Sequence, residues 1–236
     1  MILDLLRSDL LKTKKIAWLL VLFGPIGVVG LQFINYSLRY DHLLSVHPDH
    51  GYFFLVNVHA FWPPALLLGI TLIISLQASI EHRKNLWKQI LILPVRREQV
   101  YLSKLFLIVT MLLLTSLFLV GWTYVTGIYF GFTNEFSLLQ AFQMSFYTLF
   151  AAWPFVLLQF WLSMHFKNQG AALTVGIASA AFIMYAQGVP DWLPWKWPLL
   201  LDGFSESLST SVLYGSILGI VFALLSMLVL TRKDVH

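Results

Sequence analysis

The sequence contains no cysteine and few charged residues. Asp, Glu, Lys and Arg make up 11% of its 236 residues, whereas a soluble domain has about 25%. The missing cysteine excludes disulfides and thiolate metal sites. The missing G-x-x-x-x-G-K-[ST] motif excludes a nucleotide site of the P-loop type. Because 58% of the residues are hydrophobic and the mean hydropathy is +0.77, the polar residues are too few to cover a soluble fold. A soluble enzyme is therefore excluded.

Long apolar segments account for this composition. A helix needs about 20 apolar residues to cross roughly 30 Å of hydrocarbon. Six segments have about this length, so the sequence predicts an all-α integral membrane protein with a single transmembrane domain, residues 1–236. The expected spans are residues 16–36, 58–80, 105–128, 138–164, 171–188 and 211–230.

Basic residues are distributed unevenly around these spans. With both termini in the cytoplasm, thirteen of the fifteen Lys and Arg residues lie inside, and only Arg39 and Lys196 lie outside. This asymmetry is typical of multi-pass membrane proteins, and it explains the basic pI without nucleic-acid binding. The outer side is net negative, with six acidic residues: Asp41, Asp49, Glu135, Asp191, Asp202 and Glu206. We therefore expect a plasma-membrane protein surrounded by lipid, with cytoplasmic N- and C-termini.

Residues 2–13 have the pattern of an amphipathic helix. Leu3, Leu6 and Leu10 fall on one face at helical spacing, which favours an elbow helix lying on the membrane before the first span. The alternative is a charged tail that only sets the topology.

Two outer loops are expected from the spans. The first, residues 37–57, carries three histidines and two aspartates, but Pro48-Asp49 separates His47 from His50 without a scaffold. A solvated loop is therefore favoured over a zinc site. The second loop, residues 189–210, is rich in tryptophan. It is expected to form an interfacial belt or short helices in the outer leaflet, with a stacking platform for carbohydrate or peptide as the weaker alternative.

The last four spans contain no Asp, Glu, Lys or Arg. Ion-coupled carriers need such groups on their pathway, and an intramembrane hydrolase needs paired acid and base groups, so both classes are disfavoured. The last two spans instead carry small residues four apart, which predicts close helix packing rather than chemistry. These helix-packing residues are Ala172, Gly176 and Ala180 in one span, and Gly215 and Gly219, flanked by Ser211 and Ala223, in the other.

The loop after the second span has a distinct pattern. Leu86, Trp87 and Leu93 fall on one helical face and Lys84 on another, and Pro94 ends the helix because its ring clashes with the preceding turn. The sequence predicts a short amphipathic helix at about residues 81–93, parallel to the inner membrane surface.

This loop resembles the ABC-2 class of ABC-transporter permeases, and most of all the small permeases of bacitracin-export and lantibiotic-immunity systems. In that family the loop carries a Glu, then Asn/Thr-x-Trp, then Leu-Pro-x-Ser/Arg-Arg, and a Lys opens the third span. The matching positions are Glu81, Asn85, Trp87, Leu93, Pro94, Arg96 or Arg97, and Lys104. The plan of an elbow helix, six spans and short tails is also similar.

The resemblance implies that the loop helix is a coupling helix seated in a cytoplasmic ABC ATPase, with Glu81 at the hinge between span and helix. The ATPase-coupling residues would be Glu81, Arg83, Lys84, Asn85, Leu86, Trp87, Lys88, Pro94, Arg96 and Arg97. For the basic residues, topology and contact with anionic lipid are an equal alternative. This chain would be no enzyme and would bind no cofactor, since ATP and Mg²⁺ would be held by the partner subunit.

The expected function is therefore the permease subunit of an ATP-driven ABC exporter in a bacterial membrane. It would pair with a second permease protomer, identical or related, and move an amphipathic or antimicrobial-type peptide. The alternatives are an exporter of lipid or polysaccharide and a non-transporting membrane adaptor or sensor.

Overall fold

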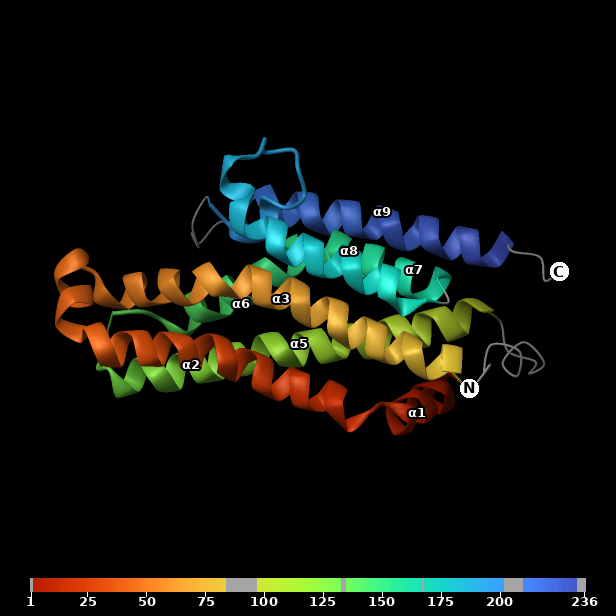
Figure 1. Ribbon diagram of the computed structural model, residues 1–236, viewed down its shortest axis with the longest axis horizontal. Coiled ribbons are helices and arrows are strands. Elements are labelled where there is room, and N and C mark those ends of the chain that lie inside the picture. Colours follow the sequence, from red (N-terminus) through yellow and green to blue (C-terminus); the bar gives the residue numbers. More distant parts are fainter. Residues whose placement is uncertain (1, 84–96, 133–134, 167, 202–209, 233–236) are drawn as a thin grey trace.

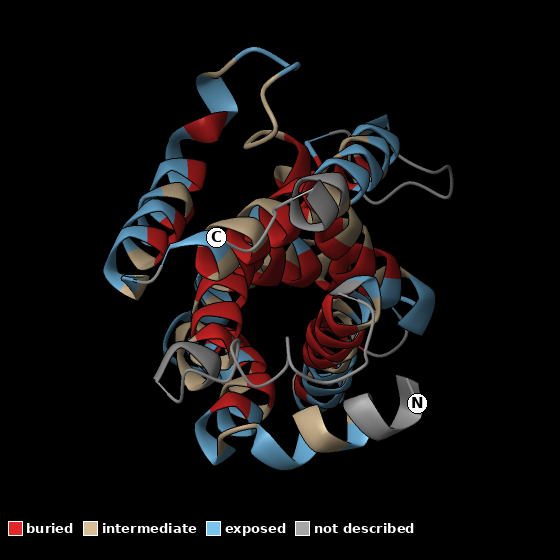
Figure 2. Cartoon of the chain, turned by 90° about the vertical axis from the view of Figure 1, so that its right-hand side faces the viewer, coloured by how far each residue is buried: buried red, intermediate tan, exposed pale blue. Residues whose placement is uncertain are grey.

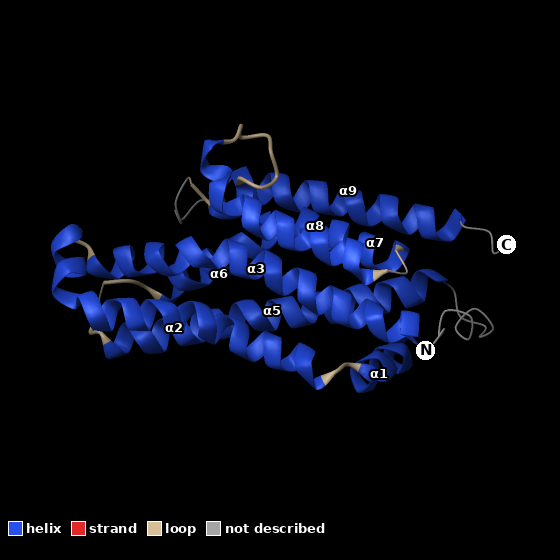
Figure 3. Cartoon of the chain, in the orientation of Figure 1, coloured by secondary structure: helices blue, strands red, loops and turns tan. Residues whose placement is uncertain are grey.

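The computed structural model describes residues 2–83, 97–132, 135–166, 168–201 and 210–232, and this part of the chain is an elongated helical bundle without strands (Figures 1 and 3). The expected all-α architecture is thereby confirmed. The elements are α1 Ile2–Lys12, α2 Lys15–Val46, α3 His50–Arg83, α5 Arg97–Tyr129, α6 Leu138–Ala151, α7 Trp153–His165, α8 Gln169–Phe182, the 3₁₀ helices η1 Ile183–Gly188 and η2 Trp197–Leu199, and α9 Thr210–Arg232.

Within the described residues, five helical segments are long and apolar enough to cross a membrane: α2, α3, α5, α8 continued by η1, and α9. A sixth span results when the bent pair α6 and α7 is counted as one. The six spans expected from the sequence are the upper end of this range. Helices suit the bilayer because each bonds its own backbone N–H and C=O groups where no water is present.

The fourth expected span, residues 138–164, is divided in the structure. α6 and α7 meet at Ala152 with a bend of 45°. Pro154 lies in the first turn of α7, where its missing N–H is tolerated but its ring would clash with a preceding helical turn. The proline therefore accounts for the break, and α9 packs against both halves.

The expectation of a solvated outer loop at residues 37–57 is wrong. α2 continues to Val46 and α3 begins at His50, so three residues connect them. A proline disfavours helix at the residue before it, and His47 before Pro48 is extended, with φ −142° and ψ 135°. Counting apolar residues finds only the part of a helix that lies in hydrocarbon. The 32 residues of α2 exceed the about 20 that cross the hydrocarbon, and the helix has a kink at Arg39, where φ −131° and ψ 28° are not helical.

The two ends of the bundle are different. α1 and the C-terminal end of α9 lie at one end, and the α2–α3 connection lies at the other (Figure 1). Following the topology predicted from the charges, we name these the inner end and the outer end. α1 is set crosswise to the long helices at the inner end (Figures 1 and 2).

Aromatic side chains join the helices at the outer end. The outer aromatic cluster consists of Tyr36 and Tyr40 from α2, Phe54 from α3, and Phe130, Phe132 and Phe136 from the chain after α5. The rings of Tyr36 and Phe54 meet edge to face with centroids 5.3 Å apart. Such pairs are favourable beyond the area that they bury.

Two carboxylates cap the start of α3 at the same end. Asp49 Oδ1 accepts a hydrogen bond from the Tyr52 amide at 2.8 Å, and Glu135 Oε2 accepts one from the Gly51 amide at 2.8 Å. Negative charge at a helix N-terminus is stabilising. A Cβ on Gly51 would lie 2.6 Å from the Glu135 Cβ, so the glycine permits this approach.

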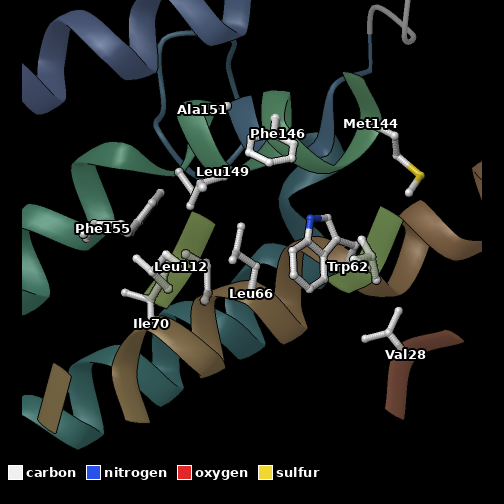
Figure 4. Close-up of a cluster of buried hydrophobic side chains, with 14 of the residues drawn as sticks. Val28, Trp62, Leu66, Ile70, Leu112, Met144, Phe146, Leu149, Ala151 and Phe155 are labelled. Carbon is white, nitrogen blue, oxygen red and sulfur yellow. The ribbon is translucent and has the colours of Figure 1, made fainter. Parts of the chain in front are cut away.

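The core runs through the middle of the bundle. Figure 4 shows Trp62, Leu66 and Ile70 of α3 facing Leu112 of α5 and Leu149 of α6. Buried residues occupy the inward faces of the helices and exposed residues the outward faces (Figure 2). In a membrane protein those outward apolar faces contact lipid, so their exposure is expected.

Candidate functional site

The coupling loop predicted from the sequence starts at the inner end of α3 and finishes at the start of α5. Glu81 and Arg83 lie in the last turn of α3, and Arg97 is the first residue of α5. The predicted coupling helix beyond Arg83 lies outside the described residues, so it stays a prediction. The same holds for its residues Lys84, Asn85, Leu86, Trp87, Lys88, Pro94 and Arg96.

The described residues at this end reveal a polar contact that joins α1 to α5. Asp9 of α1 accepts a hydrogen bond from Ser103 Oγ on Oδ2 at 2.8 Å, and its Oδ1 lies 3.4 Å from Lys104 Nζ. The side chains of Asp9 and Lys104 are only 14% and 9% exposed. Among the buried residues of the described chain, Lys104 is the only Asp, Glu, Lys or Arg.

A second set of hydrogen bonds joins the end of α1 to α3. Gln77 Nε2 donates to Thr13 Oγ1 at 3.0 Å, and Lys14 Nζ donates to Ser79 Oγ at 3.4 Å. Thr13 Oγ1 in turn donates to the Asp9 carbonyl at 2.8 Å. We call the contacts of Asp9, Thr13 and Lys14 with α3 and α5 the inner clamp.

A small hollow lies within the inner clamp. Its volume is about 20 Å³, and its lining includes Asp9, Lys12, Gln77 and Lys104. The rest of its lining is apolar: Ile80, Leu107, Ile108 and Met164. The hollow has room for about one water molecule.

The inner clamp fastens α1 to the two helices that flank residues 84–96. In the sequence, Lys104 belongs to the motif shared with ABC-2 permeases, where it opens the third span, and nothing singles out Asp9 or Gln77. Asp9 is an acidic residue in a basic N-terminal segment, and Ser103-Lys104 is a polar pair at the start of a span. Neither pattern shows that these positions contact each other.

The helix-packing residues lie on helix contacts. Ala172, Gly176 and Ala180 are buried on α8, and a Cβ on Gly176 would overlap Thr71 of α3. Close approach of α8 and α3 therefore depends on the missing side chain.

The two glycines of α9 lie against the bend between α6 and α7. A Cβ on Gly215 would overlap the backbone of Ala151, and one on Gly219 would overlap Trp153.

No group of three or more His, Asp or Glu side chains that could hold a metal occurs in the part of the chain that the structure describes. His47 contacts Asp49 and stacks on Phe53.

The tryptophan-rich outer segment belongs partly to the bundle. Trp197 is buried, and its Nε1 donates to the Asp191 carbonyl at 2.8 Å. Trp195 packs edge to face on Phe155 of α7. Trp192 is 73% exposed, so it alone of the three is free to act as an interfacial residue.

Comparison with known protein families gives one match. The family model described as ABC-2 family transporter protein matches residues 5–186, which is more than half of the chain. The matched range includes the inner clamp and the loop between α3 and α5. No curated protein and no solved structure matches the chain.

Proposed function

Since this chain belongs to the ABC-2 transporter family, we propose that it is the membrane-spanning permease subunit of an ATP-driven exporter of amphipathic, antimicrobial-type peptides. ATP hydrolysis is then the task of a separate cytoplasmic ABC ATPase subunit, and two permease protomers pair to form the transport pathway. This chain itself carries out no catalysis.

The inner clamp supports the part of the proposal in which movement of the ATPase is transmitted to the spans. A movement imposed on residues 84–96 by an ATPase has to act on the inner ends of α3 and α5. Asp9 and Lys104 tie α1 to α5, and Thr13 and Gln77 tie it to α3. The three helices would therefore move as one unit, and α3 and α5 would carry the movement across the membrane.

The charge of the outer face supports a cationic cargo. Six acidic residues against two basic ones make this face net negative under the predicted topology. Asp49 and Glu135 also cap α3, and Asp191 pairs with Lys196 at 2.6 Å. Steering depends on the summed charge, so it remains even where a carboxylate has a structural partner.

The test is whether a cytoplasmic ABC ATPase co-purifies with this chain, and whether a cationic amphipathic peptide stimulates the activity of that ATPase in reconstituted membranes. A P-loop ATPase encoded beside this chain, where there is one, is the first candidate. Trp87→Ala should weaken association at least tenfold, because truncating an aromatic anchor costs about 2 kcal/mol or more. Glu81→Ala should retain association but lose peptide stimulation.

Trp192→Ala is the matched control, since it removes an exposed tryptophan from the opposite end. It should behave as the unaltered protein in both assays. Equal ATPase binding and stimulation by Trp87→Ala and Trp192→Ala would contradict the coupling role. Unchanged peptide export after deletion of the protein, with altered lipid or glycan export, would contradict the cargo class.

A further inference from the structure

A cleft of about 320 Å³ lies between the outer half of α3 and the segment formed by η1 and η2. This volume is at the lower end of the range of small-molecule sites, about 300–1,000 Å³. In the chain, the two walls are more than a hundred residues apart, and η1 and η2 both contact α3. Its apolar lining includes Val56, Ala60, Pro64, Met184, Leu199 and Leu201.

The inner wall of the cleft is fixed by hydrogen bonds. His59, which lines the cleft, is buried, and its Nε2 lies 3.1 Å from Thr148 Oγ1 of α6. The His59 ring also bonds the backbone of Pro198 in η2. Leu200 then turns the chain in the left-handed region, with φ 45°. The cleft is therefore preformed by contacts among α3, α6 and η2.

The outer side of the cleft is open. In the part of the chain that the structure describes, Val56, Met184 and Leu201 are 38%, 63% and 50% exposed. Among the described residues of the lining, the polar ones are Tyr52, His59 and Gln187, and none of them is Asp, Glu, Lys or Arg. The described walls are mainly apolar and therefore match hydrocarbon.

The residues around the cleft are typical of the interface between the outer leaflet and water. η2 follows directly after Lys196, whose Nζ is held by Asp191 at 2.6 Å and by the Val189 carbonyl at 3.0 Å. The exposed Trp192 lies in the same segment, and tryptophan and lysine are typical of the level where headgroups begin. A lipid in the outer leaflet would thus have its chains at the depth of the cleft.

We propose that this cleft binds one acyl chain of an outer-leaflet phospholipid, which enters from the side between α3 and η1. The headgroup stays outside the cleft, toward the Trp192–Trp197 segment. This lipid site goes beyond the proposed function, because it needs neither the ATPase nor the exported peptide.

The test is native mass spectrometry of the full chain purified in detergent, with three probes: dioleoyl phosphatidylglycerol, the single-chain lysophosphatidylglycerol, and glycerophosphoglycerol, which has no acyl chain. The protein should retain one phospholipid, the single-chain lipid should displace it, and the chain-free headgroup should not. Ala60→Trp, which fills the cleft, should weaken retention at least tenfold.

Ala178→Trp is the matched control, because Ala178 is an exposed alanine of α8 that does not line the cleft. It should retain lipid as the unaltered protein does. Val56→Trp provides a second block of the cleft, and equal melting temperatures of the variants establish folding. Undiminished retention in folded Ala60→Trp and Val56→Trp would overturn the proposal, as would displacement by glycerophosphoglycerol. Displacement by a cationic amphipathic peptide but not by lysophosphatidylglycerol would overturn it in favour of a cargo site.

Discussion

Different kinds of contact hold the helices together at the inner and outer ends of this bundle. At the inner end, α1, α3 and α5 meet through an ion pair and a few hydrogen bonds around a small hollow. At the outer end, α2, α3 and the chain after α5 meet through stacked and edge-to-face rings. Polar contacts are directional and can be exchanged with water, whereas the ring contacts depend on burial over a large area. The two ends should therefore respond differently to the loss of a single side chain.

Labelling from outside tests the assignment of the two ends and should give an all-or-none result. The chain has no cysteine, so single cysteines can be introduced cleanly. Ser45→Cys at the outer end should react with an impermeant maleimide in intact cells, and Asn168→Cys should not. Both residues are exposed, so access to the cysteine is not limited by the fold. Labelling of Asn168→Cys alone would reverse the topology.

Phe54→Ala should give the largest loss of stability. Phe54 is fully buried in the outer aromatic cluster, and truncation of a buried phenylalanine costs about 3–5 kcal/mol. Thermal unfolding in detergent measures the loss. Tyr129→Ala, at a ring that is 70% exposed, is the control and should change stability little. A similar effect of the two substitutions would mean that the cluster is not a packed unit.

Asp9→Ala should destabilise the inner end by about 3 kcal/mol, because it removes the carboxylate that lies 3.4 Å from the buried Lys104 ammonium. The double variant Asp9→Ala/Lys104→Met removes both charges and should recover most of the stability. It should not recover peptide-stimulated ATPase activity, since α1 is no longer tied to α5.

The control for this prediction is Asp41→Ala, which removes an exposed carboxylate at the outer end. It should leave thermal unfolding unchanged. Full activity of the double variant would show that the inner clamp serves the fold and not the coupling.

Glu135→Ala should have the smallest effect, about 1 kcal/mol, which is typical of a lost helix cap. Its carboxylate accepts the Gly51 amide at the start of α3. Hydrogen exchange at the first turn of α3 should become faster while exchange in the core is unchanged. Slower or unchanged exchange at that turn would mean that Asp49 caps the helix alone.

Some features of the fold are visible in the sequence because they depend on local composition. Long apolar runs identify the spanning helices, and Pro154 and Pro48 accompany two of the interruptions that the structure shows near a span. The length of α2 and α3 beyond the hydrocarbon was missed, because helical residues in water need not be apolar. The rings that support this extension come from residues 36–54 and 130–136, which no local pattern connects.

The sequence by itself determined that this protein spans a membrane and that its spans are helical, and the loop after the second span suggested the ABC-2 family, to which the chain belongs. Hydrocarbon thickness and the need to bond every backbone group leave little choice once the apolar runs are set. Only the tertiary structure decided that Asp9 meets Lys104 across 95 positions of the chain, and that α3, η1 and η2 enclose a cleft. Such contacts depend on how helices far apart in the sequence pack together. Composition does not predict which side chains then face each other.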